Sequence, residues 1–270
     1  MFLGDLHTHS LCSPDGAVSM LDMARAGREA GLTYLCITDH CDLLDLHGTF
    51  TPNFDWANVA REYDLALAGL PQGLELGLGV ELGEAYENPQ TARDILAHAP
   101  QLDFVIGSAH NFHSLMGKQD FYNADYSDLD FCHAALVDYL DSIYTLSTLT
   151  DCYDTLAHIL YPLRYIHKAG QDITLAQRDY PDRLERILRQ VADSGKALEV
   201  NTWRGRTIDE WAPILRRFKD LGGEYVTVGS DAHRTPDVAK GVRESYELLK
   251  TCGYRYTAVY RDRKPTMEAI

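Results

Sequence analysis

The chain has 270 residues and a formal net charge of −15, from 25 basic and 40 acidic side chains. Because so acidic a surface repels polyphosphate at long range, this balance argues against binding to extended nucleic acid. No run approaches the roughly 18 apolar residues that a membrane span needs. Since the first histidine motif begins near Met1, we expect no signal peptide, no membrane segment and a cytoplasmic location.

Seven short apolar segments recur along the chain and predict buried parallel strands. They cover residues 3–6, 34–38, 76–80, 104–108, 155–157, 197–200 and 225–229. Helical patterns lie between most of these segments, and several end just before a glycine, as helices commonly do. The expected helices cover residues 20–30, 54–67, 128–149, 181–194, 208–221 and 236–251.

This alternation of strands and helices predicts an α/β fold with a parallel sheet and right-handed crossovers. Seven units in a chain of this length favour one domain over residues 1–270, built as a closed or nearly closed barrel. A doubly wound open sheet is the alternative, because the same alternation produces both folds. The polar and aromatic segments 39–53 and 111–127 are expected to form walls of an active site.

Most of the predicted strands are followed by a side chain that can bind a metal ion. These residues are His7, His9, His40, Glu81, His110, His158, Asp231 and His233. In a parallel barrel the carboxyl ends of all strands meet on one face, where active sites lie. A lone buried histidine is usually a hydrogen-bonded core residue. Six of the eleven histidines at strand ends favour a shared site instead.

The local spacing supports metal binding. In His7-Thr8-His9 and in Asp231-Ala232-His233, residues two apart point to the same side of an extended chain, so each pair can reach one ion. Imidazole and carboxylate donors together suit Zn, Mn or Fe better than Ca or Mg. A single tetrahedral ion uses four ligands, so this larger set predicts two or three divalent transition-metal ions, with Glu81 as a bridge. For the same reason, a purely structural metal module is disfavoured.

The order of these motifs resembles that of one known superfamily. His7-Thr8-His9-Ser10 is followed by Ser13-Pro14-Asp15-Gly16, Thr38-Asp39-His40, Glu81, Ser108-Ala109-His110 and Gly229-Ser230-Asp231-Ala232-His233. The series covers nearly the whole chain and resembles the polymerase and histidinol phosphatase (PHP) superfamily. The resemblance implies a distorted (β/α)7 TIM-like barrel with up to three metal ions. The implied metal ligands are His7, His9, Asp15, His40, Glu81, His110, His158, Asp231 and His233.

Within the superfamily, three features resemble the histidinol-phosphatase branch: Asp15, the compact length and the segment Leu198-Glu199-Val200-Asn201-Thr202. This resemblance implies a phosphoric monoester hydrolase that removes phosphate from L-histidinol phosphate in histidine biosynthesis. Attack would come from a metal-bound hydroxide, because coordination lowers the pKa of water from near 16 to about 7. Beyond the metal-bound water, we assign no catalytic side chain.

Four residues are candidates for binding the substrate. Arg164 and Arg204 follow predicted strands, and a guanidinium can offer two parallel donors to phosphate. His113 and Asn201 are further candidates.

Three acidic residues are assigned more specific roles. Glu84 or Asp45 is a candidate to receive a cationic part of the substrate. Asp5 is expected to orient an imidazole from behind.

A phosphoesterase of the same superfamily that acts on nucleotides or short oligonucleotides is the main alternative. The metal motifs are common to both activities, although the acidic charge disfavours long polymers. A small phosphorylated substrate remains compatible with that charge, since bound divalent cations reverse the local field. The oligomeric state is not indicated by the sequence.

Overall fold

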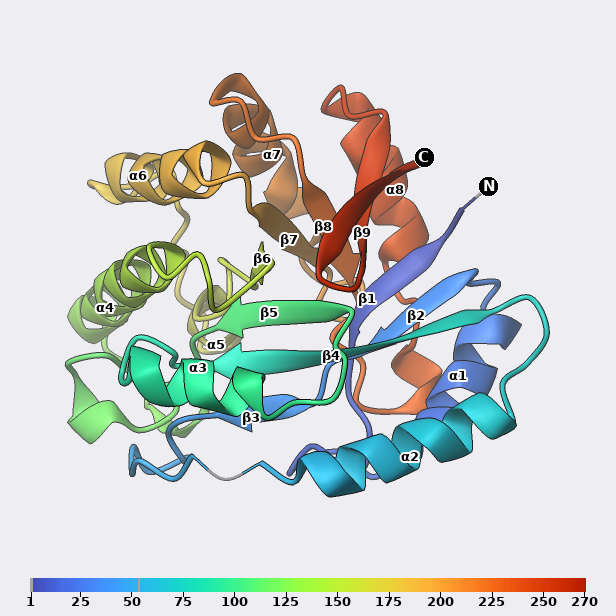
Figure 1. The fold of residues 1–270 in the computed structure, drawn as a ribbon. Coiled ribbons are helices and arrows are strands. Elements are labelled where there is room, and N and C mark those ends of the chain that lie inside the picture. The colour runs from blue at the N-terminus through green and yellow to red at the C-terminus, as the bar shows by residue number, and fades with distance from the viewer. Residues whose placement is uncertain (1, 53) are drawn as a thin grey trace.

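Eight strands run parallel in one sheet of the computed structural model, which describes residues 2–52 and 54–270 (Figure 1). Seven of them follow each other around the sheet, and β3 pairs with the far end of β4. In sheet order the strands are β1 (Gly4–Thr8), β2 (Tyr34–Ile37), β4 (Glu75–Gly83), β5 (Phe104–Ser108), β6 (Thr155–Leu156), β7 (Ala197–Asn201) and β8 (Val226–Gly229), with β3 at His40–Asp42. All seven predicted strands are therefore present.

The sheet closes into a barrel at its carboxyl-terminal face. Its two outermost strands, β1 and β8, are joined just beyond β8, where Asp231 N donates to His7 O at 2.9 Å and His9 N donates to Ala232 O at 2.8 Å. Thr8 and Ala232 also form a parallel bridge. These contacts bring the first and last histidine motifs side by side. The prediction of a nearly closed, distorted α/β barrel is confirmed, and the open doubly wound sheet is excluded.

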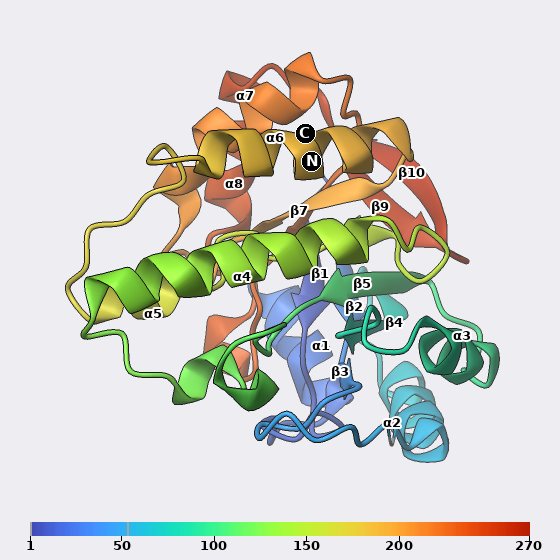
Figure 2. The same ribbon diagram turned by 90° about the vertical axis from the view of Figure 1, so that its left-hand side faces the viewer.

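The helices surround the sheet, and α4 and α6 lie next to each other on one side (Figure 2). Each predicted helix is present, and the short helices α3 and α5 are additional. The bounds are α1 Met20–Glu29, α2 Trp56–Ala68, α3 Pro89–Ala97, α4 Leu129–Ser147, α5 Leu163–Lys168, α6 Tyr180–Asp193, α7 Trp211–Asp220 and α8 Val242–Thr251. The expected start of α8 at residue 236 is wrong, because Thr235–Asp237 forms a 3-10 turn and Gly241 adopts a left-handed conformation with φ 78°.

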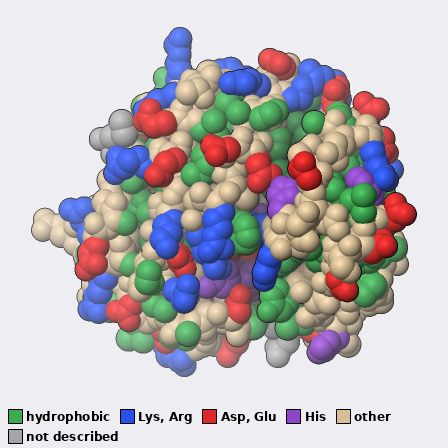
Figure 3. Space-filling view, turned by 180° about the vertical axis from the view of Figure 1, so that it is seen from behind, with side chains coloured by type: hydrophobic (Ala, Val, Ile, Leu, Met, Phe, Trp, Pro, Cys, Tyr) green, Lys and Arg blue, Asp and Glu red, His purple; other side chains and the backbone are tan. Residues whose placement is uncertain are grey.

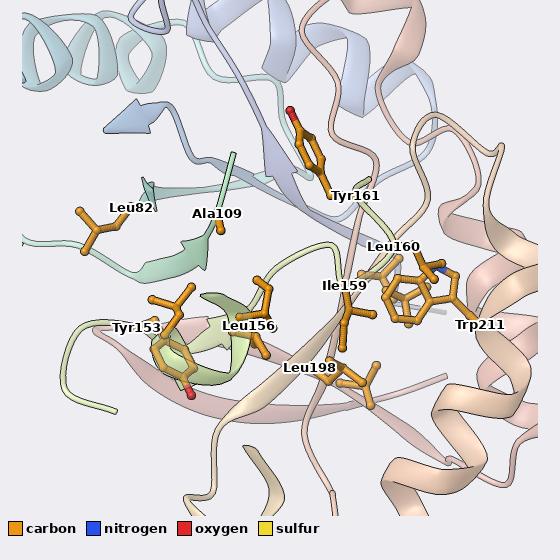
Figure 4. Packing of buried hydrophobic residues seen from close by; sticks show 14 of the residues in the cluster. Leu82, Ala109, Tyr153, Leu156, Ile159, Leu160, Tyr161, Leu198 and Trp211 are labelled. Carbon is orange, nitrogen blue, oxygen red and sulfur yellow. The ribbon is translucent and has the colours of Figure 1, made fainter. Parts of the chain in front are cut away.

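Two apolar clusters divide the core. The larger one lies between the strands and the helices, and includes Tyr153, Leu156 and Leu198 (Figure 4). The smaller one fills the barrel interior and also contains residues of the carboxyl-terminal hairpin, β9 (Tyr256–Arg261) and β10 (Lys264–Ala269). The hairpin was not predicted, and its strand β9 places Tyr260 inside, where its carbonyl accepts from Tyr34 Oη at 2.9 Å. Among the described residues, no helix has the length and apolarity needed to cross a membrane.

Glycines on β4 let the neighbouring strands pack closely inside the barrel. Alternate residues of a strand face the same side, and the interior positions of β4 are Gly77, Gly79, Glu81 and Gly83. A Cβ atom on Gly79 would lie 2.8 Å from Phe104 O, and one on Gly77 would lie even closer to the Tyr34 hydroxyl. Gly77 and Gly79 thus leave space for Tyr34 and for the backbone of β5, and Glu81 is the one large side chain that β4 presents to the interior.

We expect Gly79→Ala to lower the free energy of unfolding by about 1–3 kcal/mol, because the added methyl group meets the backbone of β5. Gly4→Ala is the matched control, since its Cβ atom would meet the ends of the Phe2 and Leu6 side chains, which can move. Urea unfolding of both variants measures the difference. Equal losses would contradict the packing described for β4.

Candidate metal centre

The Glu81 carboxylate lies at the centre of a buried group of imidazoles. Its Oε2 atom lies 3.1 Å from His7 Nε2 and 2.9 Å from His40 Nδ1. Its Oε1 atom lies 2.9 Å from His158 Nε2 and 3.2 Å from His110 Nε2. The Glu81 side chain is 1% exposed. Each oxygen therefore faces a different set of histidines, which is the arrangement expected of a bridging carboxylate.

The donor atoms in this group fit divalent metal ions. His7 Nε2 lies 3.1 Å from His9 Nε2, and His110 Nε2 lies 3.2 Å from His158 Nε2. Although His7 Nε2 and His40 Nδ1 lie close to the buried Glu81 Oε2, neither has hydrogen-bond geometry to it, and this oxygen has no hydrogen-bond partner within the described residues. Ring nitrogens that point at one another cannot all donate hydrogen bonds to each other. A bound cation would accept the lone pairs of these nitrogens and of the carboxylate oxygen at the same time. Four overlapping sets of three donors lie within 4.8 Å: His9/His40/His233, His7/His9/Glu81, His40/Asp42/His110 and Glu81/His110/His158.

The outer part of the group is formed by Asp15 and the residues around it. His233 Nε2 lies 3.0 Å from Asp15 Oδ2 and 3.4 Å from His40 Nε2. The His9 ring stacks against that of His40 and against that of His233, with centroid distances of 4.2 and 4.0 Å. Asp231 has a left-handed backbone with φ 60°, and its Oδ1 lies 3.7 Å from His9 Nε2. The structure thus brings all nine predicted ligands into one group.

Most of the inner histidines also contact a polar partner through their second ring nitrogen. His7 Nδ1 lies 2.5 Å from Glu199 Oε1, and His110 Nδ1 lies 3.2 Å from Asp42 Oδ1. His9 Nδ1 lies 3.0 Å from the Ser13 hydroxyl. In metal sites such partners fix the ring orientation and the tautomer.

These partners were not predicted from the sequence. For Glu199 a signal was present, because it lies two residues before the predicted site residue Asn201 on the same strand, so both side chains face the same side. Asp5 does not orient an imidazole, because its carboxylate accepts from Ser230 N at 2.8 Å and Ala239 N at 2.9 Å. It holds the backbone that follows β8, which explains its burial near the motif.

The charges of the group shift several pKa values. Burial raises the pKa of Glu81, but the neighbouring imidazoles of His7, His110 and His40 outweigh burial and hold it well below its usual range. Burial likewise opposes ionisation of Asp231, while the Arg164 guanidinium lowers the pKa of that carboxyl. Both carboxylates are therefore charged at neutral pH, as metal ligands must be.

Arg164 and Asn201 lie directly beside the group. Arg164 Nη1 donates to Asp231 Oδ2 at 2.9 Å, and its Nη2 donates to Asn201 Oδ1 at 2.7 Å. The Nε atom of this buried arginine has no partner in residues 2–52 and 54–270. Arg204 lies further out, with its Nε atom 3.5 Å from the carbonyl oxygen of Asp231. Both guanidinium groups thus occupy the β7–β8 side of the site.

Three other predicted residues have different surroundings. His113 Nδ1 lies 3.6 Å from Glu87 Oε1, and none of its contacts with the described residues reaches the histidine group. Asp45 is half-buried and accepts from His47 N and Thr49 N in a turn. Glu84 is buried, and its Oε1 atom accepts from His110 N at 2.6 Å. It supports the chain behind His110.

The two predicted wall loops lie next to the site and contact each other. Asn111 Nδ2 donates to Asp45 O at 2.8 Å and to Lys118 O at 2.7 Å. Asn53, the last residue of the first loop, lies outside the described residues. Figure 3 shows histidine side chains in a recess of the surface, with lysine and arginine side chains beside it. A small anionic ligand suits such a recess.

The protein is a parallel α/β barrel with imidazoles and carboxylates gathered at its carboxyl-terminal face. This combination places it among the barrel proteins that hold a metal centre at that face. The model of the PHP domain family matches residues 5–203, and the chain belongs to this family. The histidinol-phosphatase of Lactococcus lactis is 26% identical over 271 residues, which cover 96% of this chain and 95% of that protein. The probable histidinol-phosphatase of Clostridium acetobutylicum is 26% identical over 256 residues, 93% and 94% of the two chains.

Solved structures show the same fold. The crystal structure of histidinol phosphate phosphatase from Lactococcus lactis, complexed with zinc, L-histidinol and phosphate, matches with a TM-score of 0.83 at 24% identity and 98% coverage of both chains. The putative histidinol phosphatase of Listeria monocytogenes matches with a TM-score of 0.71 at 18% identity, over 89% of this chain and 99% of that one. Both likenesses support the barrel described above.

We expect the metal-stripped protein to lose stability between pH 6.5 and 9. Burial lowers the pKa of His40, but the charges of Glu81 and Asp42 outweigh it and raise the pKa to about 9. Burial and Asp42 raise the pKa of Glu84 to about 8. Both groups bind protons more tightly in the folded than in the unfolded chain, so their contribution is present at low pH and is lost as pH rises through these values.

Thermal unfolding of the stripped protein at several pH values measures this effect. In Glu84→Gln the loss of stability up to pH 8 should be shallower, because one of the groups with a raised pKa no longer titrates. A melting temperature that is constant from pH 6.5 to 9 would contradict the charge arrangement around His40.

Proposed function

We propose that this protein is a metal-dependent phosphoric monoester hydrolase that converts L-histidinol phosphate to L-histidinol and phosphate in histidine biosynthesis. The observation that carries the proposal is the gathering of six imidazoles, Glu81, Asp231 and Asp15 at one barrel face, with a buried guanidinium beside them. The full-length likeness to proteins named histidinol-phosphatase supports this choice of substrate.

Two or three divalent transition-metal ions, Zn, Mn or Fe, would be held by this group. The proposed ligands are His7, His9, Asp15, His40, Glu81, His110, His158, Asp231 and His233. When bound, such ions lower the pKa of water and neutralise the charge of a phosphoryl group. Glu81 can serve two ions at once, since its two oxygens face different histidines.

The protein's own cations would bind and orient the phosphate. Asp231 and Asn201 hold two nitrogens of the Arg164 guanidinium, so its plane is fixed before any substrate arrives. This fixed orientation reduces the entropy lost on binding. Arg204 lies on the same side and would contact the phosphate from the rim. His113 is not proposed as a phosphate ligand, because its contacts are with Glu87, Tyr86 and the Asp138 carboxylate.

The substrate assignment predicts a preference within a panel of phosphate esters. We expect kcat/KM for L-histidinol phosphate to exceed the values for nucleoside monophosphates and short oligonucleotides by at least about tenfold, or about 1.4 kcal/mol in transition-state binding. Release of inorganic phosphate by the metal-loaded protein measures each value. A clear preference for nucleotides would favour the alternative activity of the same family.

The metal assignment predicts two or three transition-metal ions per chain by elemental analysis of the purified protein. We expect His7→Ala combined with His9→Ala to lower both this number and the phosphatase activity, the latter by orders of magnitude. His98→Ala is the control, because His98 is exposed at the end of α3 and contacts Asp94 O. Full activity of a metal-free preparation would contradict the proposal.

A further inference from the structure

Glu199 is a buried carboxylate that lies inside the barrel behind the metal centre. It belongs to β7 and is 1% exposed. Its Oε1 atom lies 2.5 Å from Nδ1 of His7, which is the nitrogen turned away from Glu81. Glu199 does not belong to any of the donor sets formed by the described residues. Its position indicates that it acts on the centre through His7.

The second oxygen of Glu199 connects it to other parts of the site. Oε2 accepts from His158 N at 2.9 Å and lies 3.4 Å from Asn201 Nδ2. Gly229 on β8 leaves space for this contact, because a Cβ atom there would lie 2.3 Å from His7 Cβ and 2.8 Å from Glu199 Oε1. Residues of β1, β7 and β8 thus surround the Glu199 carboxylate: His7 and Asn201 contact it, and Gly229 leaves space for it.

We propose that Glu199 is a positioning residue that fixes the tautomer of His7 and thereby raises the metal affinity of the centre. When Nε2 binds a metal ion the His7 ring is neutral, and Glu199 Oε1 lies where it accepts the one remaining ring proton, on Nδ1. Nε2 then presents its lone pair to the space between Glu81 and His9. This inference rests on the metal centre of the proposed function, but not on the identity of the substrate.

The other inner histidines have weaker partners. His9 Nδ1 meets the Ser13 hydroxyl at 3.0 Å, and His158 Nδ1 lies 3.4 Å from the Tyr139 hydroxyl. His110 has a carboxylate partner, but the Asp42 side chain is 27% exposed and its contact is longer, at 3.2 Å. A short bond to a fully buried carboxylate is the strongest of these interactions. Glu199 is therefore the partner whose replacement should weaken metal binding most.

Glu199→Gln tests the proposal with little change in size. Glutamine has a single acceptor oxygen, so its NH2 group must face either His158 N–H or His7 Nδ1. We expect the affinity of the stripped full-length protein for Zn²⁺, measured by competition with a chelator, to fall by about 10–100-fold. Asp42→Asn should produce a smaller decrease. An affinity of Glu199→Gln within about twofold of the unsubstituted protein would overturn the proposal.

Asp154→Asn is the control for a merely structural role. Asp154 is a buried carboxylate that accepts from Val105 N at 2.9 Å and pairs with Arg263, at a distance from the histidine group. We expect this variant to lower the melting temperature and to keep its Zn²⁺ affinity. Equal losses of Zn²⁺ affinity in Asp154→Asn and Glu199→Gln would show that general destabilisation is the cause, and would overturn the proposal.

The tautomer can also be measured in the unsubstituted protein, which removes any dependence on the folding of a variant. Nitrogen-15 chemical shifts of the His7 ring in the zinc-loaded protein should show a proton on Nδ1 and none on Nε2. A zinc-loaded protein whose His7 ring carries its proton on Nε2 would overturn the proposal. Because neither experiment includes a phosphate ester, an incorrect substrate assignment would leave both results unchanged.

Discussion

The buried charge of Glu81 is the constraint on which the rest of this structure depends. A carboxylate removed from water is costly unless cations or donors surround it. Here four imidazole nitrogens lie within 3.2 Å of its two oxygens. Every strand that contributes one of these imidazoles must end at the same height in the barrel. The need to surround the buried Glu81 carboxylate with imidazoles therefore constrains both the ends of the strands and the composition of the site.

The division of the barrel interior follows from that requirement. Apolar side chains and Tyr260 of the hairpin fill the end away from the site. The opposite end is polar, and glycines at 83 and 229 leave space there for the side chains of Asp42, His7 and Glu199. The hydrophobic end supplies the stability that a cluster of buried charges lacks by itself, because apolar burial is favourable without any specific partner.

The sequence predicted the strands, and the placement of the proposed ligands at one barrel face, for a physical reason. A buried parallel strand needs a continuous apolar segment, and the residue that follows it must lie at the barrel face. The position of His7, Glu81 or His110 could therefore be inferred from local pattern alone. The family resemblance then added Asp15, which lies in a loop and has no such pattern.

The residues that the sequence analysis missed depend on contacts between distant segments. Glu199 is separated from His7 by 192 positions, and Asp42 from His110 by 68 positions, so only the closed barrel reveals these pairs. Asp5 has the right position for a partner of an imidazole, but the backbone at Ser230 and Ala239 occupies its oxygens. The hairpin β9–β10 was missed because β10 is largely exposed and lacks an apolar pattern.

Anomalous X-ray scattering from crystals of the metal-loaded protein tests the central claim most directly. The account predicts peaks of metal density on both sides of Glu81, one next to His7 and His9 and one next to His110 and His158. Metal density elsewhere in the molecule, with ordinary hydrogen bonds joining these side chains, would contradict it.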